Sequence, residues 1–432
     1  MATRLPLFLF CLLISSDAIF AQDAVTMSER FATGSRTHVD LRLELSGEVA
    51  MPGKAGQKIE IAGTSVLRYD ERVLPTEEAG GGAVLRIYRD VNFSRTIAGE
   101  TQKQEIRPAV RRMVVMRSAE GKKAPFSPDG PLTFGEIDAV RVDLFSPVLV
   151  PGLLPTKAVK VGDLWTVSTP ATLDLTGLEK IESGKLTVEY VGMVTVGGVR
   201  RYRLSITGSV NGMSEDGPTR QAIDATAYFD PAENRLAYLS LKGTQELLDG
   251  SGKTTGRLTG RFTMSRTSSA VSELTEESIA KLNVKPTPET TLLLYENADL
   301  GLRFVHPRNW RVGAVQGQQV TVEDPKSGGG ILITVETEAR TPTADAYLKE
   351  AREFISKQKG RVLAADGPRR AGSFDRFRID AELGDEKIRM EYAVRTEPGV
   401  GGVTFAARMP ANRINDLTSD VERILKELKR TK

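Results

Sequence analysis

The chain has few of the side chains that most often carry enzyme chemistry. Among its 432 residues there are one cysteine, Cys11, and two histidines, His38 and His306. Neither histidine has a second histidine at metal-ligand spacing, so imidazole ligands predict no metal site. No Gly-x-Ser-x-Gly sequence occurs, which leaves a serine hydrolase without a nucleophile elbow. The sequence therefore predicts no catalytic, cofactor-binding or metal-binding residue, and no cofactor.

Long apolar runs and a strong excess of one charge are also absent. Beyond the N-terminus no run of 18 apolar residues occurs, so no membrane-spanning segment is predicted in the mature chain. The 59 basic and 56 acidic side chains leave a net charge of +3, and the two signs are interspersed. This pattern does not favour nucleic acid as a partner.

The N-terminus has the pattern of an export signal. Arg4 supplies a positive end, residues 5–14 an apolar core and residues 15–21 a small-residue exit. We expect cleavage after Ala21, because an uncleaved membrane anchor needs about 20 apolar residues and this core has about half of them. Cys11 would leave with the signal. A bacterial periplasm or cell surface fits the resulting lack of cysteine, so we predict an exported protein, periplasmic or extracellular.

Alternation of apolar and polar residues dominates residues 26–269 and predicts antiparallel strands. The clearest runs cover residues 38–45, 84–88, 186–196, 201–210, 228–248 and 257–267. Glycine, asparagine or proline turns separate them, which indicates strands with one buried face. A strongly curved sheet or half-barrel is the simplest architecture for them. A short helix is expected at residues 134–141.

Residues 144–155 form the most apolar segment of the expected mature chain, although its three prolines forbid a regular helix or central strand. The segment can be a lid over an apolar pocket, or a loop that fills one end of the sheet. Apolar runs more often belong to a core, which favours the second interpretation. The sequence Val-Lys-Val-Gly-Asp-Leu-Trp at 159–165 resembles an element of uncharacterised secreted β-rich proteins, for which no activity is implied.

Residues 271–290 are expected to form a linker, because Pro286 and Pro288 favour a stiff extended connector. Strands are predicted beyond it at residues 319–323, 331–335, 374–383, 387–395 and 402–408. Two helices with one apolar stripe each are predicted, one from about residue 342 to Gly360 and one over about residues 412–429. Helices on one antiparallel sheet indicate a layered domain.

A short pattern at the start of this second part resembles a known family. Gly301, Phe304, Pro307 and Trp310 occupy all four positions of Gly-x-x-Phe-x-x-Pro-x-x-Trp. The pattern predicts a strand, a proline turn and a return strand that starts at Trp310, and it resembles the opening hairpin of PsbP-like and DcrB-like proteins. The resemblance covers residues 294–432, about a third of the chain. It implies a small α/β/α sandwich and an accessory or scaffold role.

Three other patterns invite a functional interpretation. Residues 249–255 contain the end of a phosphate-binding loop, but the preceding glycine is missing and a strand-like run follows, which favours a hairpin turn. The run from Gly328 to Gly330 lacks the spaced glycines of a dinucleotide site and predicts a turn. Arg107, Arg111 and Arg112 could meet an anionic polymer or lipid head group, although a solvated strand edge is the commoner role.

Together these patterns predict an α+β fold, with an N-terminal antiparallel β-rich domain and a C-terminal PsbP-like α/β/α sandwich. The expected division is a signal peptide at 1–21, the β-rich domain at 22–270, a linker at 271–290 and the α/β domain at 291–432. The predicted function is that of a non-enzymatic binding or scaffold protein of the bacterial envelope, with an unknown envelope protein as partner. Two alternatives stay open: a carrier of a lipid or other apolar small molecule, and a hydrolase that uses two carboxylates.

Overall fold

Strands make up most of the fold. The computed structural model describes residues 23–51, 56–75, 82–117 and 123–431. The expected signal peptide at 1–21, with Cys11, lies outside these residues. Within the described part there are 24 strands and five α-helices, and the chain is 55% strand and 15% helix. Two large antiparallel sheets, of 12 and eight strands, hold most of the strands.

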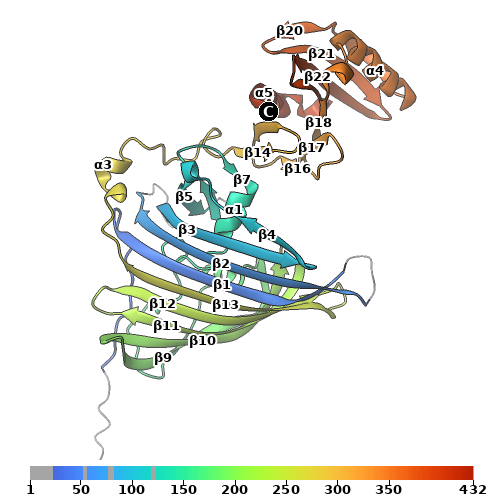
Figure 1. The fold of residues 1–432 in the computed structure, drawn as a ribbon. Helices are drawn as coiled ribbons and strands as arrows, with labels where there is room; N and C mark the ends of the chain where they lie inside the picture. Colours follow the sequence, from blue (N-terminus) through green and yellow to red (C-terminus); the bar gives the residue numbers. More distant parts are fainter. Residues whose placement is uncertain (1–22, 52–55, 76–81, 118–122, 432) are drawn as a thin grey trace, which may run out of the picture.

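The larger sheet is built from long strands that curve together around one face (Figure 1). Its long strands are β1 (Arg36–Ala50), β2 (Lys58–Val73), β3 (Ala83–Ile97), β9 (Lys180–Val196), β10 (Val199–Ser214), β11 (Gly217–Asp230), β12 (Arg235–Leu248) and β13 (Thr254–Ser268). The short ones are β4 (Glu100–Gln104), β5 (Arg112–Arg117), β6 (Lys123–Phe126) and β8 (Leu164–Thr166). Five of the six expected alternating runs fall within single strands, and the run 228–248 covers the end of β11, a turn and β12, so the expected antiparallel sheet is present.

The first and last long strands pair at the centre of this sheet. β1 pairs with β13 on one side and with β2 on the other, and the two arms end in β6 and β8. One cross-strand row contains Gly63, Leu45, Gly260, Gly243, Ile223 and Gly208. Four glycines in one row leave little side-chain bulk there, and glycine in a strand permits a sharp bend. The row is therefore where the long strands can curve most strongly.

The eight-stranded sheet lies in the second part of the chain, after the expected linker. Its strands are β16 (Arg311–Val312), β17 (Gln319–Asp324), β18 (Gly329–Glu336), β19 (Arg361–Ala365), β20 (Arg369–Ala371), β21 (Phe374–Leu383), β22 (Glu386–Glu397) and β23 (Gly401–Pro410). The helices are α4 (Ala344–Lys357) and α5 (Ile414–Glu427). The five strands and two helices predicted from periodicity are confirmed, with bounds that differ by a few residues.

The two helices lie on opposite faces of this sheet. Ile355 of α4 packs with Phe377 and Tyr392, whereas Leu417 of α5 packs with Ala393, on the other face of β22. A separate four-stranded sheet covers the other side of α5. Its strands, in spatial order, are β24 (Lys429–Arg430), β15 (Leu302–His306), β14 (Leu293–Asn297) and β7 (Leu132–Thr133).

The expected fold class, α+β with a C-terminal α/β/α sandwich, is therefore wrong. The chain is largely antiparallel β structure, and α5 lies between two sheets instead of on an outer surface. The physical reason is that β14 and β15 do not join the eight-stranded sheet. They pair with each other in a separate sheet. Leu302 and Phe304 of β15 then bury the second apolar side of α5.

The predicted opening hairpin is also wrong in its pairing. The strand before the proline turn is present as β15, but its antiparallel partner is β14, and the return strand β16 pairs with β17. Trp310 explains the change of sheet. Its side chain is 1% exposed, and its indole N–H donates to Asp420 of α5 over 3.1 Å. The chain must leave β15 to place this ring in the core beside α5.

Contacts cross the expected linker. β7, which precedes α1 (Phe134–Arg141), pairs in parallel with β14, and Arg308 donates to the carbonyl of Pro125. A short helix, α3 (Glu276–Ile279), lies within the expected linker. The boundaries at 22–270, 271–290 and 291–432 stay a prediction, because these contacts do not show which unit folds by itself.

We expect the substitution Phe304→Ala to lower the free energy of unfolding by about 3–5 kcal/mol, because it leaves a cavity beside α5 in a fully packed core. The matched control is Phe354→Ala, at a half-exposed position on the outer side of α4. It should lower the free energy of unfolding far less. Denaturant unfolding followed by tryptophan fluorescence measures both. Equal losses for the two variants would contradict the assigned core.

Candidate functional site

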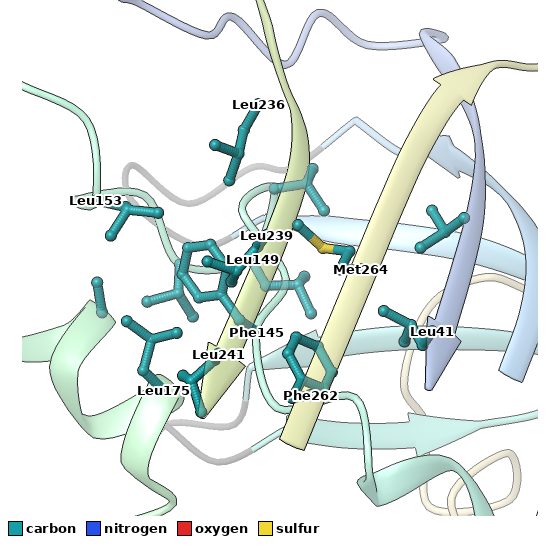
Figure 2. Close-up of a cluster of buried hydrophobic side chains, with 14 of the residues drawn as sticks. Leu41, Phe145, Leu149, Leu153, Leu175, Leu236, Leu239, Leu241, Phe262 and Met264 are labelled. Atoms are coloured by element: carbon teal, nitrogen blue, oxygen red, sulfur yellow. The ribbon is translucent and has the colours of Figure 1, made fainter. Parts of the chain in front are cut away.

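The inner face of the 12-stranded sheet is filled by the chain itself. Segment 144–155 crosses this face without regular secondary structure, and Phe145, Leu149 and Leu153 are all buried there. Figure 2 shows Phe145 and Leu149 near Leu239 of β12, and Leu153 and Phe262 of β13 belong to the same buried cluster. The segment is part of the core, so the interpretation as a filling loop is confirmed.

Helix α2 (Thr169–Thr176) extends the same filling. Ser168 caps its N-terminus, and Leu175 faces the cluster shown in Figure 2. Trp165 of β8 donates its indole N–H to the carbonyl of Leu153 over 2.9 Å. This bond ties the end of segment 144–155 to the edge of the sheet.

A buried cluster of charged side chains holds the beginning of the segment. Arg86 of β3 is 1% exposed and donates to Asp143 Oδ2 at 2.6 Å, to Ser146 Oγ at 3.0 Å and to Glu71 Oε2 at 3.3 Å. Its guanidinium carbon lies 4.3 Å from the centre of the Tyr69 ring. Arg86 thus joins two strands of the sheet to two residues at the start of the segment.

Lys123 extends this cluster to α2. Its ammonium group donates to the Asp143 carbonyl at 2.5 Å and lies 3.2 Å from the Asp174 carboxylate. Asp174 also accepts from the backbone N–H of Ser146 at 3.3 Å. The segment is therefore fixed to the sheet and to α2 by the same group of charges.

The electrostatics of the cluster favour a fixed charge pattern. Burial opposes the charge on Arg86, yet Tyr69, Asp143 and Glu71 outweigh it and hold the pKa of the guanidinium well above its usual value. Burial raises the pKa of the Asp174 carboxyl above its usual value, although Lys123 opposes the shift. Such a network is costly to break, because loss of one partner leaves an unpaired buried charge. The cluster therefore serves to attach segment 144–155 to the sheet.

Two of the hollows that border the described residues bear on function. One, of about 270 Å³, lies at the edge of the charged cluster and is lined by Arg86, Asp143 and Asp174 among others. The other, of about 1000 Å³, lies beside α5 and β15. We call the second hollow the α5 groove and define it by Leu292, Arg303, Val305, Phe374, Arg423 and Lys426.

The two histidines lie in different environments. His38 Nδ1 lies 2.9 Å from Asp70 Oδ1, on the sheet surface. His306 is buried, with Nδ1 2.9 Å from the carbonyl of Pro307. Among the residues that the structure describes, no group of three His, Cys, Asp or Glu side chains is placed as metal ligands would be.

The arginines singled out in the sequence do not converge on an open surface. Arg107 is bound by Glu136, with nitrogen–oxygen distances of 2.7 and 2.8 Å, and also donates to a backbone carbonyl. Arg112 is bound by Asp129, while Arg111 is exposed. The carboxylates beside Arg107 and Arg112 make an anion site there unfavourable.

The two glycine-rich motifs are turns, as predicted. Asp249 Oδ1 accepts from the backbone N–H groups of Ser251 and Lys253, which closes the hairpin between β12 and β13. Gly328 has a φ of +73° in the turn that joins β17 to β18. Neither motif is followed by a helix that could face a phosphate.

Comparison with known proteins adds a weak likeness. No protein-family model and no curated protein sequence matches the chain. The solved structures include PsbP (CyanoP) from Synechocystis sp. PCC 6803, at 15% identity and a TM-score of 0.26, covering 32% of this chain and 92% of that one. The Ran-binding protein Mog1p of Saccharomyces cerevisiae matches at 10% identity and a TM-score of 0.25, covering 32% and 95%.

A larger share of the chain is similar to lipovitellin, at 9% identity and a TM-score of 0.32, covering 56% of this chain and 26% of that one. All of these TM-scores are low. The chain has a weak PsbP-like fold resemblance, and the likeness concerns the fold alone. Within the described residues, no helix combines the length and apolar character that a membrane span requires.

Sequence reasoning missed the charged cluster. Residues 84–88 were correctly expected to form a strand, but Arg86 was not singled out within it. The available signal was a charged residue inside an apolar run, between Leu85 and Ile87. Asp143 gave a similar signal, because it directly precedes the most apolar segment. Their partnership depends on a contact across 57 positions of sequence, which no local pattern shows.

We expect Asp143→Ala to lower the free energy of unfolding by about 3–5 kcal/mol, because Arg86 would keep a buried charge without its closest partner. Asp129→Ala removes the carboxylate of the partly exposed pair with Arg112 and should cost about 1 kcal/mol or less. Thermal and denaturant unfolding measure both. A loss at Asp143 no greater than that at Asp129 would contradict the role given to the cluster.

The buried His306 predicts a pH dependence. Burial lowers the pKa of His306 below its usual value, although hydrogen bonds to the backbone oppose the shift. Below pH of about 6.5 the unfolded chain takes up a proton at this position while the folded chain does not. Stability should therefore fall as the pH drops from about 7 towards 5.

Denaturant unfolding of the wild type and of His306→Asn across this pH range tests the prediction. In His306→Asn, the free energy of unfolding should change much less between pH 7 and pH 5 than in the wild type. His38→Asn, the control at the other histidine, should keep the change that His306 causes. An unchanged slope in His306→Asn would show that other groups cause it.

Proposed function

We propose that this chain is a non-enzymatic, exported protein of the bacterial envelope that acts by binding or holding partner proteins. The observation that carries the proposal is the filled inner face of the 12-stranded sheet, where Phe145, Leu149 and Leu153 occupy the space that a ligand would need (Figure 2). A rigid core with its working surfaces on the outside suits a binding protein. The pattern of Gly301, Phe304, Pro307 and Trp310 supports kinship with PsbP-like proteins in residues 294–432.

The carrier alternative has less support. The hollow at the edge of the charged cluster has a volume of about 270 Å³ and borders Arg86, Asp143 and Asp174. Typical ligand pockets have about 300–1,000 Å³ and are mainly apolar. A lipid chain would have to displace segment 144–155, which the charged cluster holds in place.

The hydrolase alternative also has less support. Asp143 and Asp174 lie in one cluster, but Arg86 binds the first carboxylate and Lys123 pairs with the second. General acid catalysis needs a carboxyl group that keeps its proton near neutral pH and reaches the substrate. Both carboxylates thus have a cationic partner within the fold, and that pairing accounts for them without a substrate.

Production of the full chain in a bacterial host tests export and ligand content together. We expect the protein in the periplasmic or extracellular fraction, with an intact mass that corresponds to loss of residues 1–21. Native mass spectrometry should then show the mature chain without an apolar ligand. Retention of residues 1–21 would contradict export, and a co-purified lipid would favour the carrier.

The binding role needs its own measurement. Photo-crosslinking amino acids at the exposed positions Phe134 and Leu164, with one at the exposed polar position Glu233 as control, should give discrete protein adducts in native cells from at least one apolar position. Absence of any adduct would count against a binding or scaffold role. Turnover of ester, glycoside or phosphate substrates that Asp174→Asn abolishes would show an enzyme instead.

A further inference from the structure

The α5 groove combines apolar and basic surface. It has a volume of about 1000 Å³ and lies between α5, the edge of β15 and the turn from β20 to β21. Leu292, Val305 and Phe374 supply apolar atoms, and Arg423 and Lys426 line the helix side. Figure 1 shows α5 beside the small sheet, at the end of the chain that carries the C-terminus.

One edge of β15 is only partly used. On one side β14 pairs with all five residues of β15, whereas on the other side β24 pairs with Leu302 and Arg303 alone. Within the described part of the chain, no strand pairs with residues 304–306 on that second side. The edge therefore continues past the first residue of β24, where Leu428 connects β24 to α5, and borders the groove there.

The register decides which backbone groups point to this edge. The backbone N–H of Thr431 donates to the carbonyl of Gly301 over 2.8 Å, and Arg303 is opposite Lys429. Because hydrogen-bonding groups of an antiparallel strand alternate between its two sides, the N–H and C=O of Val305 also point away from β14. An added strand would find these groups directly beyond β24.

The charges of the groove favour an acidic occupant. Five basic side chains line it, Arg303, Arg376, Arg423, Lys426 and Lys429, against three acidic ones, Glu289, Glu422 and Glu427. The three acids are paired with Arg423, Arg376 and Lys429 respectively. Among described residues, no carboxylate lies within ion-pair distance of Arg303 or Lys426, and both side chains are exposed. Two cations thus remain for a partner's carboxylates.

We propose that the α5 groove binds an extended acidic peptide segment of a partner protein, which adds as a strand to the edge of β15. This inference rests on the proposed binding function and names the surface that performs it. Alternate side chains of a strand point to opposite sides. Peptide side chains on one side of the added strand would lie towards α5, where Phe374 and Lys426 line the groove, and those on the other side would lie beside Leu292 and Arg303.

A peptide fits these observations better than other anions do. Lipid head groups and nucleic acids offer negative charge, but they have no peptide backbone to pair with Val305. A free strand edge is a template for another chain, and proteins commonly block such edges. Here the edge is left open next to unpaired cations, which is what recognition of a peptide requires.

The mature full-length chain and a labelled peptide, acetyl-(Glu-Val)₄-amide, test the proposal by fluorescence anisotropy at low salt. Binding should weaken on the order of tenfold when Arg303→Gln and Lys426→Gln are combined, because both free cations are lost. The matched control combines Lys349→Gln and Arg352→Gln on the exposed side of α4, and it should leave the affinity unchanged. Added salt should weaken binding to the wild type.

Two altered probes separate backbone pairing from simple charge attraction. A peptide methylated on alternate backbone nitrogens should lose affinity although its charge is the same, and acetyl-(Lys-Val)₄-amide should not bind. Equal binding of the methylated peptide would overturn strand addition. Tighter binding of anionic vesicles or single-stranded DNA, with the same sensitivity to the Arg303 and Lys426 substitutions, would overturn the choice of a peptide.

The failure of this inference is distinct from failure of the proposed function. If no acidic peptide binds but photo-crosslinked partner adducts form in cells, the α5 groove is the wrong surface and the binding role survives. If neither is found, both proposals are lost.

Discussion

Burial of segment 144–155 against the inner face of the 12-stranded sheet is the constraint on which the first part of the molecule depends. A curved sheet of this length has one apolar concave face, and that face must be covered. Here the chain covers it with its own residues, and the prolines of the segment allow an irregular path that follows the curve. The sheet and the segment therefore stabilise each other as parts of one buried cluster.

The charged cluster around Arg86 fixes the position of segment 144–155 on the sheet. Apolar packing alone tolerates sliding, because it has no direction. Hydrogen bonds from one guanidinium to Glu71, Asp143 and Ser146 have defined geometry and allow one register. The desolvation of these charges costs free energy that the ion pairs offset, so we interpret the cluster as a source of specificity more than of net stability.

The second part uses one helix to join two sheets. The apolar stripe of α5 faces the eight-stranded sheet, and the small sheet covers its other side through Leu302 and Phe304. Because β7 belongs to the first part and pairs with β14, the small sheet also connects the two parts of the chain. The same sheet leaves the end of β15 unpaired beside α5, so the element that connects the parts also offers an edge to a partner.

The sequence by itself determined most of the long strands, the helices α1, α4 and α5, and the turns at 249–255 and 328–330, because alternation, helical periodicity and turn residues act over a few positions. It did not indicate β2 or α2. It also indicated that segment 144–155 is core. Only the tertiary structure decided the sheet to which each strand belongs: β15 pairs with β14 and not with β16, which turned the expected α/β/α sandwich into a different layering. It alone joined Arg86 to Asp143 and placed Arg303 and Lys426 along the same groove. Such contacts depend on side chains that are distant in sequence and meet only when the sheets pack.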